Sequence, residues 1–517
     1  MLNIRLTSKN FKVYPDGKVS KKSKSPKLNM QAKFPFAGFP ISQREKFFQM
    51  LLELGKSFVV VEEKDKAGTS AKDRFVARRY TPGTLLSETW QSSEETRYLL
   101  SISLGKQEEG KESDEIPIGL AYIDVSTDRA VQTRTSTIGE LEHELARLSP
   151  VEVVLPGPLK QYLEDHSDGK NCIEANDADL RHMLSKLMPL LRQSGSSIAY
   201  IGVPARATQV EFIHLENSAE GLIETHLKDC LLSEMPRLSE SNHQSAESFM
   251  QIDASTLLGL EIRQSLRQNV GAQVKGVYSS PTSRAGTLLS VIKRTLTPSG
   301  TRLLVNTLSQ PSTDLEMITT RHDLVEAFLR RSSLREDLRD QLKAMSNTGK
   351  GEISRILQRF SANGSTAPGL AGALAGGRDL WDLKQRIEAI NNIAQTIKVA
   401  LSAQGSRDEK SSVPLKAFVN DIRTVADWAS MIERSVVPSV LDATPVTLAE
   451  QTEEDTDSLD QAEPAASEVK DPEDEKAASW WIDPKWVSLQ NPGKGYRLTC
   501  FFPTLVSALR CASCMIG

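Results

Sequence analysis

The sequence predicts a multidomain protein in which mixed α/β domains precede an all-α domain. Up to about residue 235, short apolar runs typical of strands are interrupted by single helical segments. After Asp253, apolar residues recur at intervals of three and four, which is typical of helices. A chain of 517 residues is long enough for about three domains.

Residues 1–90 are expected to form the first domain. A helix is predicted after Ser42, because Phe47, Leu51 and Leu54 follow helical spacing. The stretches "SFVVVEE" and "RFVARRYTPG" are predicted strands.

The predicted end of this domain is the Thr-Pro-Gly-Thr stretch from Thr81 to Thr84. Pro82 and Gly83 fit the two central positions of a type II turn, in which glycine relieves a positive φ. Such a turn closes one domain and opens a linker to the next.

Residues 91–240 are expected to form an α/β domain. "PIGLAYIDVSTDRAVQTR" predicts two strands joined by a polar Ser-Thr-Asp turn, and "VEVVLP" predicts a short buried strand. Between them, Thr137 and Glu140 have the spacing of a capping box. The apolar face of the helix that follows is predicted to contain Ile138, Leu141, Leu145 and Leu148.

Residues 250–447 are expected to form the helical domain. Three helix starts are predicted from capping patterns: Thr297 before Pro298, Thr313 with Glu316, and Ser333 with Glu336. A long helix is predicted from a seam at Leu380, Leu383, Ile387, Ile390, Ala394, Ile397 and Leu401. A second helix is predicted to run back beside it, with Leu415, Val419, Ile422, Val425 and Ile432.

Charge is distributed unevenly along the chain. Between Glu450 and Lys476 there are twelve acidic residues and two lysines, a net charge of −10. Since the whole chain carries −4, the remainder carries about +6, which is compatible with nucleic acid without establishing it. Residues 448–478 are expected to be a disordered acidic linker, and residues 479–517 have no clear element pattern.

The cysteines and the apolar runs exclude several classes of protein. Five cysteines, with Cys172 and Cys230 far apart, favour a reducing compartment over a disulfide framework. Cys511 and Cys514 form a Cys-x-x-Cys pair with no second pair or histidine cluster, so two incidental thiols are favoured over zinc. No apolar run reaches the roughly 18–20 residues of a membrane span.

The candidates for catalysis are weak. Gly55-Lys56-Ser57 resembles the end of a phosphate-binding loop, but Met50 stands where the first glycine is needed, and Gly55 is better explained as a helix C-cap. Asp124 ends a predicted strand, where an aspartate could hold a metal, but a lone aspartate is better explained by an Asx-type turn. His322 is interpreted as a packed or half-exposed helix residue. No catalytic, cofactor-binding or metal-binding residue is predicted.

Basic residues in the first domain allow two interpretations. They are Lys46, Lys56, Arg74, Arg78 and Arg79. Such side chains contact phosphates of a duplex in some proteins. They also protect exposed strand edges by charge, and composition alone favours this second interpretation.

The order of segments resembles that of MutS-family DNA mismatch repair proteins. "PFAGFPISQREKFFQMLLELGKSFVVVEE…RRYTPGTLLSE" resembles the end of the family's mismatch-binding domain. "RYLLSI" and "IGLAYIDVST…ELEHELARLSPVEVVLP" resemble its connector domain, which has an RNase H-like fold without nuclease function. The family pattern at the start of the helical core is matched by Leu288, Leu289, Thr295, Thr297, Gly300, Arg302, Leu304, Gln310, Pro311, Arg321 and Val325.

This resemblance implies a division of the chain and a function. Residues 1–90 would be a partial mismatch-binding domain, 91–240 the connector, 250–447 the core and lever helices, and 479–517 an aberrant or partial start of the clamp. The implied function is binding of mismatched duplex DNA within an ATP-gated clamp. The implied partners are mismatched DNA, a MutS-type dimer partner and downstream repair factors, in the mitochondrion or nucleus and without a membrane.

Two family features are expected to be missing from this chain. The Phe-x-Glu mismatch reader should lie upstream of "LNIRLT", and the ATPase domain with its phosphate-binding loop should follow the clamp. The chain is therefore expected to be a truncated product, possessing neither ATPase activity nor strong mismatch preference, and ATP and magnesium would belong to the full-length family only. The alternative function is a truncated interaction protein that binds a repair partner without DNA or ATP.

Overall fold

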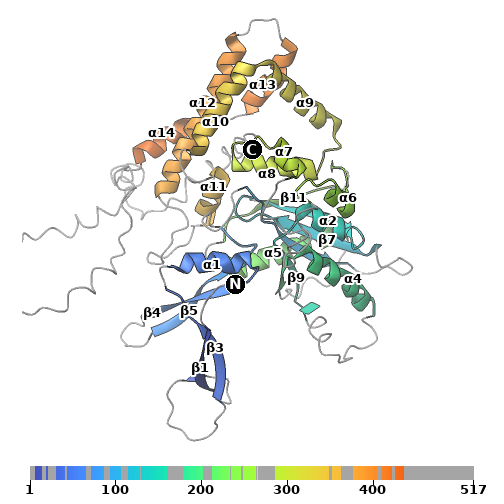
Figure 1. Cartoon of the computed structure of the whole chain (residues 1–517), viewed down its shortest axis with the longest axis vertical. Helices are drawn as coiled ribbons and strands as arrows, with labels where there is room; N and C mark the ends of the chain where they lie inside the picture. Colours follow the sequence, from blue (N-terminus) through green and yellow to red (C-terminus); the bar gives the residue numbers. More distant parts are fainter. Residues whose placement is uncertain are drawn as a thin grey trace, which may run out of the picture. The chain divides into compact units, whose positions relative to one another are not determined.

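The computed structural model divides into two compact units, residues 1–82 and 83–517 (Figure 1). The structure describes residues 6–13, 19–20, 31–40, 43–65, 72–86, 94–105, 115–128, 130–157, 159–160, 178–201, 212–232, 235–245, 248–263, 265, 286–347, 352–362, 377–403, 409–421 and 426–435. The acidic segment 448–478, the residues after it and Cys172 therefore lie outside the described residues. No helix within the described ranges is long and apolar enough to cross a membrane.

The described residues of the first unit form two small antiparallel sheets and one helix. The strands β1 (Leu6–Val13), β2 (Val19–Ser20) and β3 (Gln31–Ala37) form a sheet of order β2-β1-β3. The two predicted strands are β4 (Phe58–Asp65) and β5 (Lys72–Tyr80), which pair to form the second sheet. The predicted helix is α1 (Arg44–Glu53).

Aromatic side chains join α1 to the β4–β5 sheet. The ring of Phe48 on α1 lies 4.6 Å from that of Phe58 and 5.7 Å from that of Tyr80. The helix ends at Glu53 with Leu54 as its C-cap, and Gly55 follows with a φ of 68°, so Gly55 terminates the helix as predicted but stands one residue after the cap. This stretch is a helix end and has no phosphate-binding loop geometry.

The second unit begins with a six-stranded sheet of order β10-β9-β6-β7-β8-β11. Its strands are β6 (Leu99–Leu104), β7 (Pro117–Ile123), β8 (Ala130–Thr137), β9 (Glu152–Pro156), β10 (Ser197–Ile201) and β11 (Ser239–His243). The first three pair as an antiparallel meander, whereas β9 runs parallel to β6, β10 parallel to β9 and β11 parallel to β8. The predicted strands at "PIGLAYI", "AVQTR" and "EVVLP" are thus confirmed.

Helices cover both faces of this sheet. On one face, α2 (Leu141–Leu148) and α4 (Ala178–Ser194) pack on a cluster that includes Leu100, Ile102 and Leu120. On the other face, α5 (Phe212–Leu231) packs on Leu99, Ala121, Ile123 and Val154. Neighbouring strand residues such as Leu99 and Leu100 point to opposite faces, because side chains alternate along a strand.

The helical part follows in chain order. Its helices are α6 (Ala254–Gly259), α7 (Leu288–Ile292), α8 (Pro298–Ser309), α9 (Leu315–Arg330), α10 (Ser332–Asn347), α11 (Ile353–Ala362), α12 (Gly377–Ala403), α13 (Glu409–Asp421) and α14 (Ala426–Ser435). The 27-residue α12 spans about 40 Å at 1.5 Å per residue. It contacts α10, α11, α13 and α14, and Figure 1 shows α10 lying along it.

The predicted seam of α12 is confirmed. Leu383, Ile387 and Ile397 are fully buried, and Leu401 is half-buried. The predicted returning helix is described as two helices, α13 and α14, whose Leu415 and Ile432 both pack in these clusters. Ile422 and Val425 lie between them, outside the described residues.

Several local predictions about turns and caps are wrong. Gly83 does not have a positive φ, so the turn at Pro82-Gly83 is not type II. Three capping boxes fail: α2 begins after Glu140 without a side-chain cap, Asp314 rather than Thr313 caps α9, and Ser333 lies inside the first turn of α10. Thr297 does cap α8, since its hydroxyl oxygen accepts a hydrogen bond from the N–H of Gly300 at 3.2 Å.

Candidate functional site

A buried ion pair holds the start of the second unit at Gly83. The N–H of Gly83 donates to Oε2 of Glu152 at 2.8 Å. The other carboxylate oxygen, Oε1, lies 3.1 Å from Nε2 of His226, and both side chains are almost fully buried. A Cβ at position 83 would lie 2.9 Å from both Glu152 Oε2 and Leu99 Cδ1. Glycine is therefore needed here for space and not for its φ.

This arrangement favours the charged form of His226. Burial lowers its pKa, but hydrogen bonds with Cys230 and Glu152 and the negative charge of Glu152 outweigh burial and raise the pKa to about 10. Cys230 Sγ lies 3.8 Å from His226 Nε2, and this thiol is only 4% exposed. Glutamate, histidine and cysteine also occur together in nucleophilic sites, but this set is buried in the core and serves to anchor the chain.

Asp124 organises a tight turn at the end of β7. Its carboxylate accepts from the N–H of Ser126 at 3.0 Å, from the hydroxyl of Ser126 at 2.7 Å and from the N–H of Arg97 at 3.0 Å. This is the Asx-type turn predicted from the sequence. Among the described residues, no three His, Cys, Asp or Glu side chains converge to hold a metal ion.

Asp128 shares this turn, and its surroundings favour the neutral carboxyl group. Its Oδ2 accepts from the N–H of Asp124 at 3.2 Å. Burial and the neighbouring Asp124 carboxylate raise the pKa of Asp128 to about 7, while the guanidinium of Arg302 lowers it in part. Tyr98 is buried beside this pair, and burial followed by the charge of Asp128 raises its pKa.

Helices α8 and α11 contribute side chains near Asp124 and Asp128. Arg302 of α8 donates to Oε1 of Glu352, and its own raised pKa reflects Glu352, Asp124 and Asp128 after the opposing effect of burial. From α11, Gln358 Nε2 donates to the carbonyl oxygen of Asp128 at 3.1 Å. We call this set the junction cluster: Tyr98, Asp124, Asp128, Arg302, Glu352, Arg355 and Gln358.

Helix α11 is the bridging element of the junction. Its Ile356 and Leu357 pack with α12 and α14, whereas its Ala362 packs in the cluster beneath the sheet. Arg355 is fully buried, and none of its guanidinium nitrogens has a hydrogen-bond acceptor among the described residues. Its nearest carboxylate oxygen is Oε2 of Glu352, 3.5 Å from Nε.

A second buried charge cluster joins β8, α2 and Phe249. Arg134 and Arg147 both pair with Glu144, at 3.1 and 2.5 Å. The same two guanidiniums lie 4.8 and 4.9 Å from the ring centre of Phe249. Burial is offset here by shared charge and cation–π contact, so the cluster fixes the segment that leads from the sheet to the helices.

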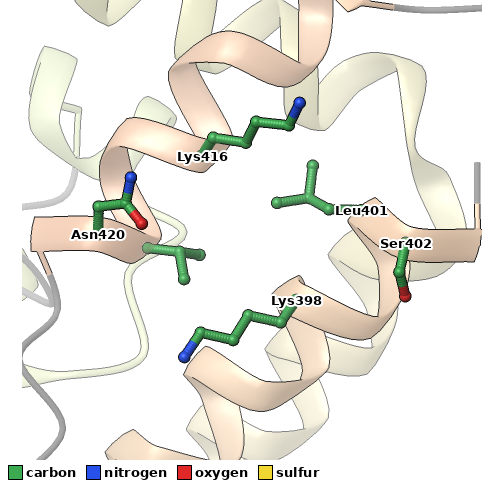
Figure 2. Close-up of a pocket in the computed structure, with 6 residues that line it drawn as sticks. Lys398, Leu401, Ser402, Lys416 and Asn420 are labelled. Atoms are coloured by element: carbon green, nitrogen blue, oxygen red, sulfur yellow. The ribbon is translucent and has the colours of Figure 1, made fainter. Parts of the chain in front are cut away.

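An open groove of about 380 Å³ lies between α12 and α13 (Figure 2). Figure 2 shows Lys416 on one wall, Lys398 on the other and Leu401 between them, and Ser402, Val419 and Asn420 complete the lining. Neither lysine forms an ion pair with any described residue. Two cationic side chains with amide and hydroxyl groups are suited to an anion such as a phosphodiester.

The basic residues predicted in the first unit do not form one site. Arg74 pairs with Glu63 across the β4–β5 sheet at 2.7 Å. Arg78 donates to the hydroxyl of Tyr80 at 3.0 Å and lies over its ring. Lys46, Lys56 and Arg79 are exposed. Partners within the sheet thus occupy Arg74 and Arg78, which agrees with the edge-protection interpretation.

Comparison with protein-family models decides the family. Three models match in chain order: MutS domain I over residues 18–89, MutS domain II over 97–193 and MutS domain III over 255–471. Together they cover about three quarters of the chain. The chain belongs to the MutS family.

Similar curated proteins carry the same family name. The DNA mismatch repair protein MutS of Nitrobacter hamburgensis is 28% identical over 389 residues, covering 72% of this chain and 39% of that protein. A DNA mismatch repair protein MutS of Rhodopseudomonas palustris is 29% identical over 380 residues, covering 71% of this chain and 36% of that protein. This chain therefore spans less than two fifths of the length of these MutS relatives.

The residues that match the MutS family pattern at the start of domain III have distinct structural roles. Thr297 and Gly300 form the N-cap of α8, and Thr295 Oγ1 lies 2.8 Å from Thr301 Oγ1 beside it. Arg302 joins the junction cluster, and the carbonyl oxygen of Pro311 accepts from the N–H of Met250 at 2.8 Å. Arg321 and Val325 are exposed on α9, as is His322, so the packed interpretation of His322 is wrong.

Several important residues of this MutS chain were missed by sequence analysis. Glu152 had a signal, because it is an acidic residue inside the otherwise apolar strand "VEVVLP". Arg355 had no such signal, because Ser354 precedes it and Glu352, Gln358 and Arg359 share its helical face, a pattern that suggests an exposed position. Lys398 and Lys416 had none, because their proximity depends on how α13 packs against α12. Cys511 and Cys514 lie outside the described residues.

Proposed function

We propose that this chain acts in DNA mismatch repair as a DNA-binding scaffold of the MutS type. The observation that carries the proposal is the match of three MutS domain models in order along one chain. The relatives with these domains are named DNA mismatch repair proteins. In the proposed whole assembly, a MutS-type dimer holds mismatched duplex DNA and ATP with magnesium controls its clamp, in the mitochondrion or nucleus.

Within this proposal, residues 91–240 form an RNase H-like connector. The strand order β10-β9-β6-β7-β8, with an antiparallel meander followed by two parallel strands, supports this assignment. The carboxylate of Asp124 accepts from the N–H groups of Ser126 in its own turn and of Arg97, which supports a structural and not a nucleolytic role. In this proposal the connector contacts repair partners and sets the orientation of the helical part.

We assign the groove between α12 and α13 as a contact to the DNA backbone. Lys398 and Lys416 face it from two helices, and neither is neutralised by a carboxylate of the described residues. A lysine that binds a phosphate releases a counterion, so binding weakens as salt rises. Because phosphate contacts do not read bases, the groove would support matched and mismatched duplexes alike.

The experiment is a salt titration of the full chain with a labelled 30-base-pair duplex, with and without one mismatch. Replacing both lysines, Lys398→Gln with Lys416→Gln, is expected to reduce the slope of log affinity against log salt by about 2. A matched control replaces Lys228 and Lys343, which already pair with Glu224 and Asp340. The control is expected to leave the slope within about 0.5 of the original value.

The outcomes separate the two candidate functions. Salt-dependent binding to DNA supports the DNA-binding scaffold. An unchanged slope in the double variant would show that the groove between α12 and α13 does not contact the DNA backbone. The alternative is an interaction protein that binds a repair partner through the connector and helical surfaces. If the chain does not bind DNA even at a low salt concentration of about 50 mM, the interaction-protein function replaces the DNA-binding scaffold.

A further inference from the structure

The groove between α12 and α13 combines two cationic side chains with apolar ones. Lys398 and Lys416 are exposed, and neither forms an ion pair with a carboxylate of the described residues. Figure 2 shows Leu401 between these two lysines, and Val419 also lines the groove. A peptide segment that fits this lining needs acidic side chains on both sides of one aliphatic side chain.

The two halves of α12 differ in their balance of charge. In the first half, Lys384 pairs with Glu388 and with Glu433 of α14, at 3.1 and 3.4 Å. After Glu388, the rest of α12 contains Lys398 and no acidic residue. The positive charge beside α13 is therefore not offset along α12 itself, and an anionic segment is attracted there.

The chain itself contains a segment of the complementary chemistry. Residues 450–476, which we call the acidic tract, carry a net charge of −10. Within the tract, Asp457–Asp460 has the sequence Asp-Ser-Leu-Asp, with a leucine between two aspartates. The other branched aliphatic residue of the tract, Val469, is followed by Lys470, whose charge would be repelled by the groove. Asp457–Asp460 is therefore the part of the tract that best matches the lining.

The chain is long enough for the tract to reach the groove. Glu433, near the end of α14, is held 3.4 Å from Lys384 of α12. Lys398 lies fourteen residues further along α12, which is about 21 Å at 1.5 Å per residue. Asp457 follows Glu433 by twenty-four residues, and a chain of that length can span up to about 80 Å. No described helix has to move for the two to meet.

We propose that the acidic tract docks in the groove through Asp457–Asp460 and shields it from the DNA backbone. The two aspartates pair with the two lysines, and Leu459 packs against Leu401 and Val419. Exposed ion pairs are weak individually. A segment of the same chain, however, acts at an effective concentration on the order of millimolar, so weak contacts are enough to occupy the groove part of the time. The shielding from DNA rests on the proposed function of the groove, whereas the docking itself does not.

Carbodiimide crosslinking of the full chain tests the docking. The reagent joins a lysine amine to a neighbouring carboxylate as an amide, with loss of water, and mass spectrometry of the monomer locates the joined residues. At about 50 mM salt, Lys398 and Lys416 are expected to crosslink to the tract at least about fivefold more than Lys46 and Lys56, two exposed lysines of the first unit. The crosslink of Lys384 to Glu433 is the internal reference.

Salt provides a second readout of the docking. At about 500 mM salt the Debye length falls to about 4 Å, so exposed charges interact weakly. The crosslinks between the groove and the tract are expected to fall at least about threefold relative to the Lys384–Glu433 crosslink.

Substitutions in the tract test the shielding. Asp457→Asn with Asp460→Asn is expected to tighten the binding of a matched 30-base-pair duplex at least about threefold at about 50 mM salt, because the groove becomes free. In a chain that also carries Lys398→Gln and Lys416→Gln, the same substitutions are expected to change the affinity less than about 1.5-fold, because the groove no longer contacts phosphate.

A matched control removes the same charge from another part of the tract. Asp471→Asn with Asp474→Asn changes the net charge by the same amount but leaves Asp457–Asp460 intact. This control is expected to change the affinity for DNA less than about 1.5-fold at the same salt concentration.

Each result decides for or against the proposal. Absence of crosslinks between the groove and the tract at low salt overturns the docking, and so does equal crosslinking to Lys46 and Lys56. Crosslinks found only between two chains assign the groove to a second copy and overturn it as well. An equal gain in affinity when both groove lysines are replaced shows general repulsion between tract and DNA, which overturns the shielding. Because crosslinking is measured without DNA, failure of the docking is distinguishable from failure of the proposed function.

Discussion

Replacing Glu152 by glutamine is expected to loosen the anchor at Gly83 far more than its small change in shape suggests. Glu152 accepts a hydrogen bond from the N–H of Gly83 with one oxygen and pairs with His226 through the other. Glutamine has one acceptor oxygen and no charge. It can satisfy Gly83 or His226, but it cannot balance a buried imidazolium.

The magnitude follows from the burial of the pair. The side chains of His226 and Glu152 are 6% and 1% exposed. Removing one partner of a buried charged pair costs about 3–5 kcal/mol. At 1.36 kcal/mol per factor of ten, the site should open roughly 10²- to 10⁴-fold more often.

Cys230 provides the assay, because its thiol lies 3.8 Å from His226 and is buried. The other four cysteines, Cys172, Cys500, Cys511 and Cys514, are replaced by serine in all samples. The rate of thiol labelling at pH 7.5, divided by the rate in the unfolded chain, measures how often the site opens. Glu224→Gln is the matched control, since Glu224 lies on the same helix in an exposed pair with Lys228.

The pH dependence gives an independent check of sign. The folded pKa of His226, about 10, lies above the ordinary value of 6.5, so its stabilisation is complete below pH 6.5 and is lost as pH rises toward 10. Labelling of the wild type, normalised to the unfolded chain, is therefore expected to accelerate about tenfold per pH unit within that window. The Glu152→Gln variant is expected to show no such acceleration. The reasoning is refuted if the variant labels within threefold of the wild type at pH 7.5.

Two further predictions concern the helices. Ile387→Ala in the buried seam of α12 is expected to lower the free energy of unfolding of the helical part by about 2–5 kcal/mol, whereas Val399→Ala, at a position 55% exposed on the same helix, should change it by less than about 0.5. Urea unfolding followed by circular dichroism measures both, and equal effects would contradict the assigned seam. Thr297→Ala is expected to cost about 1 kcal/mol through loss of the α8 cap, and Ser333→Ala, inside the first turn of α10, much less; equal midpoint shifts would show that Thr297 is no cap.

The sequence by itself determined the identity of most elements and their order. The apolar runs "PIGLAYI" and "EVVLP" are strands because each is buried in the sheet, and a buried strand needs continuous apolar residues. The seam from Leu380 to Ile397 predicted α12 because three- and four-residue spacing places these side chains on one helical face. The order of such segments was also enough to indicate the MutS family, which the domain models show.

Helix ends depended on the tertiary structure. Thr137 had the right spacing for a capping box, yet it belongs to β8, where strand pairing with Pro117 fixes its backbone. Similarly, Asp314 and not Thr313 caps α9, because the two residues compete for one position and the path of the chain selects between them. Local patterns predict that a cap exists nearby, but the residue that serves is chosen by packing.

The residues that hold the second unit together were decided only by the tertiary structure. Glycine at position 83 is a residue type common in turns, but its role as an anchor is set by its hydrogen bond to Glu152, 69 residues further along the chain. The junction cluster likewise brings the turn at Asp124 together with Arg302 and Gln358, which lie roughly 200 residues later in the sequence. Residue spacing along the chain predicts contacts within one helix or strand. The partner of a buried charged side chain depends instead on which oppositely charged group the tertiary structure brings to the same water-excluded position.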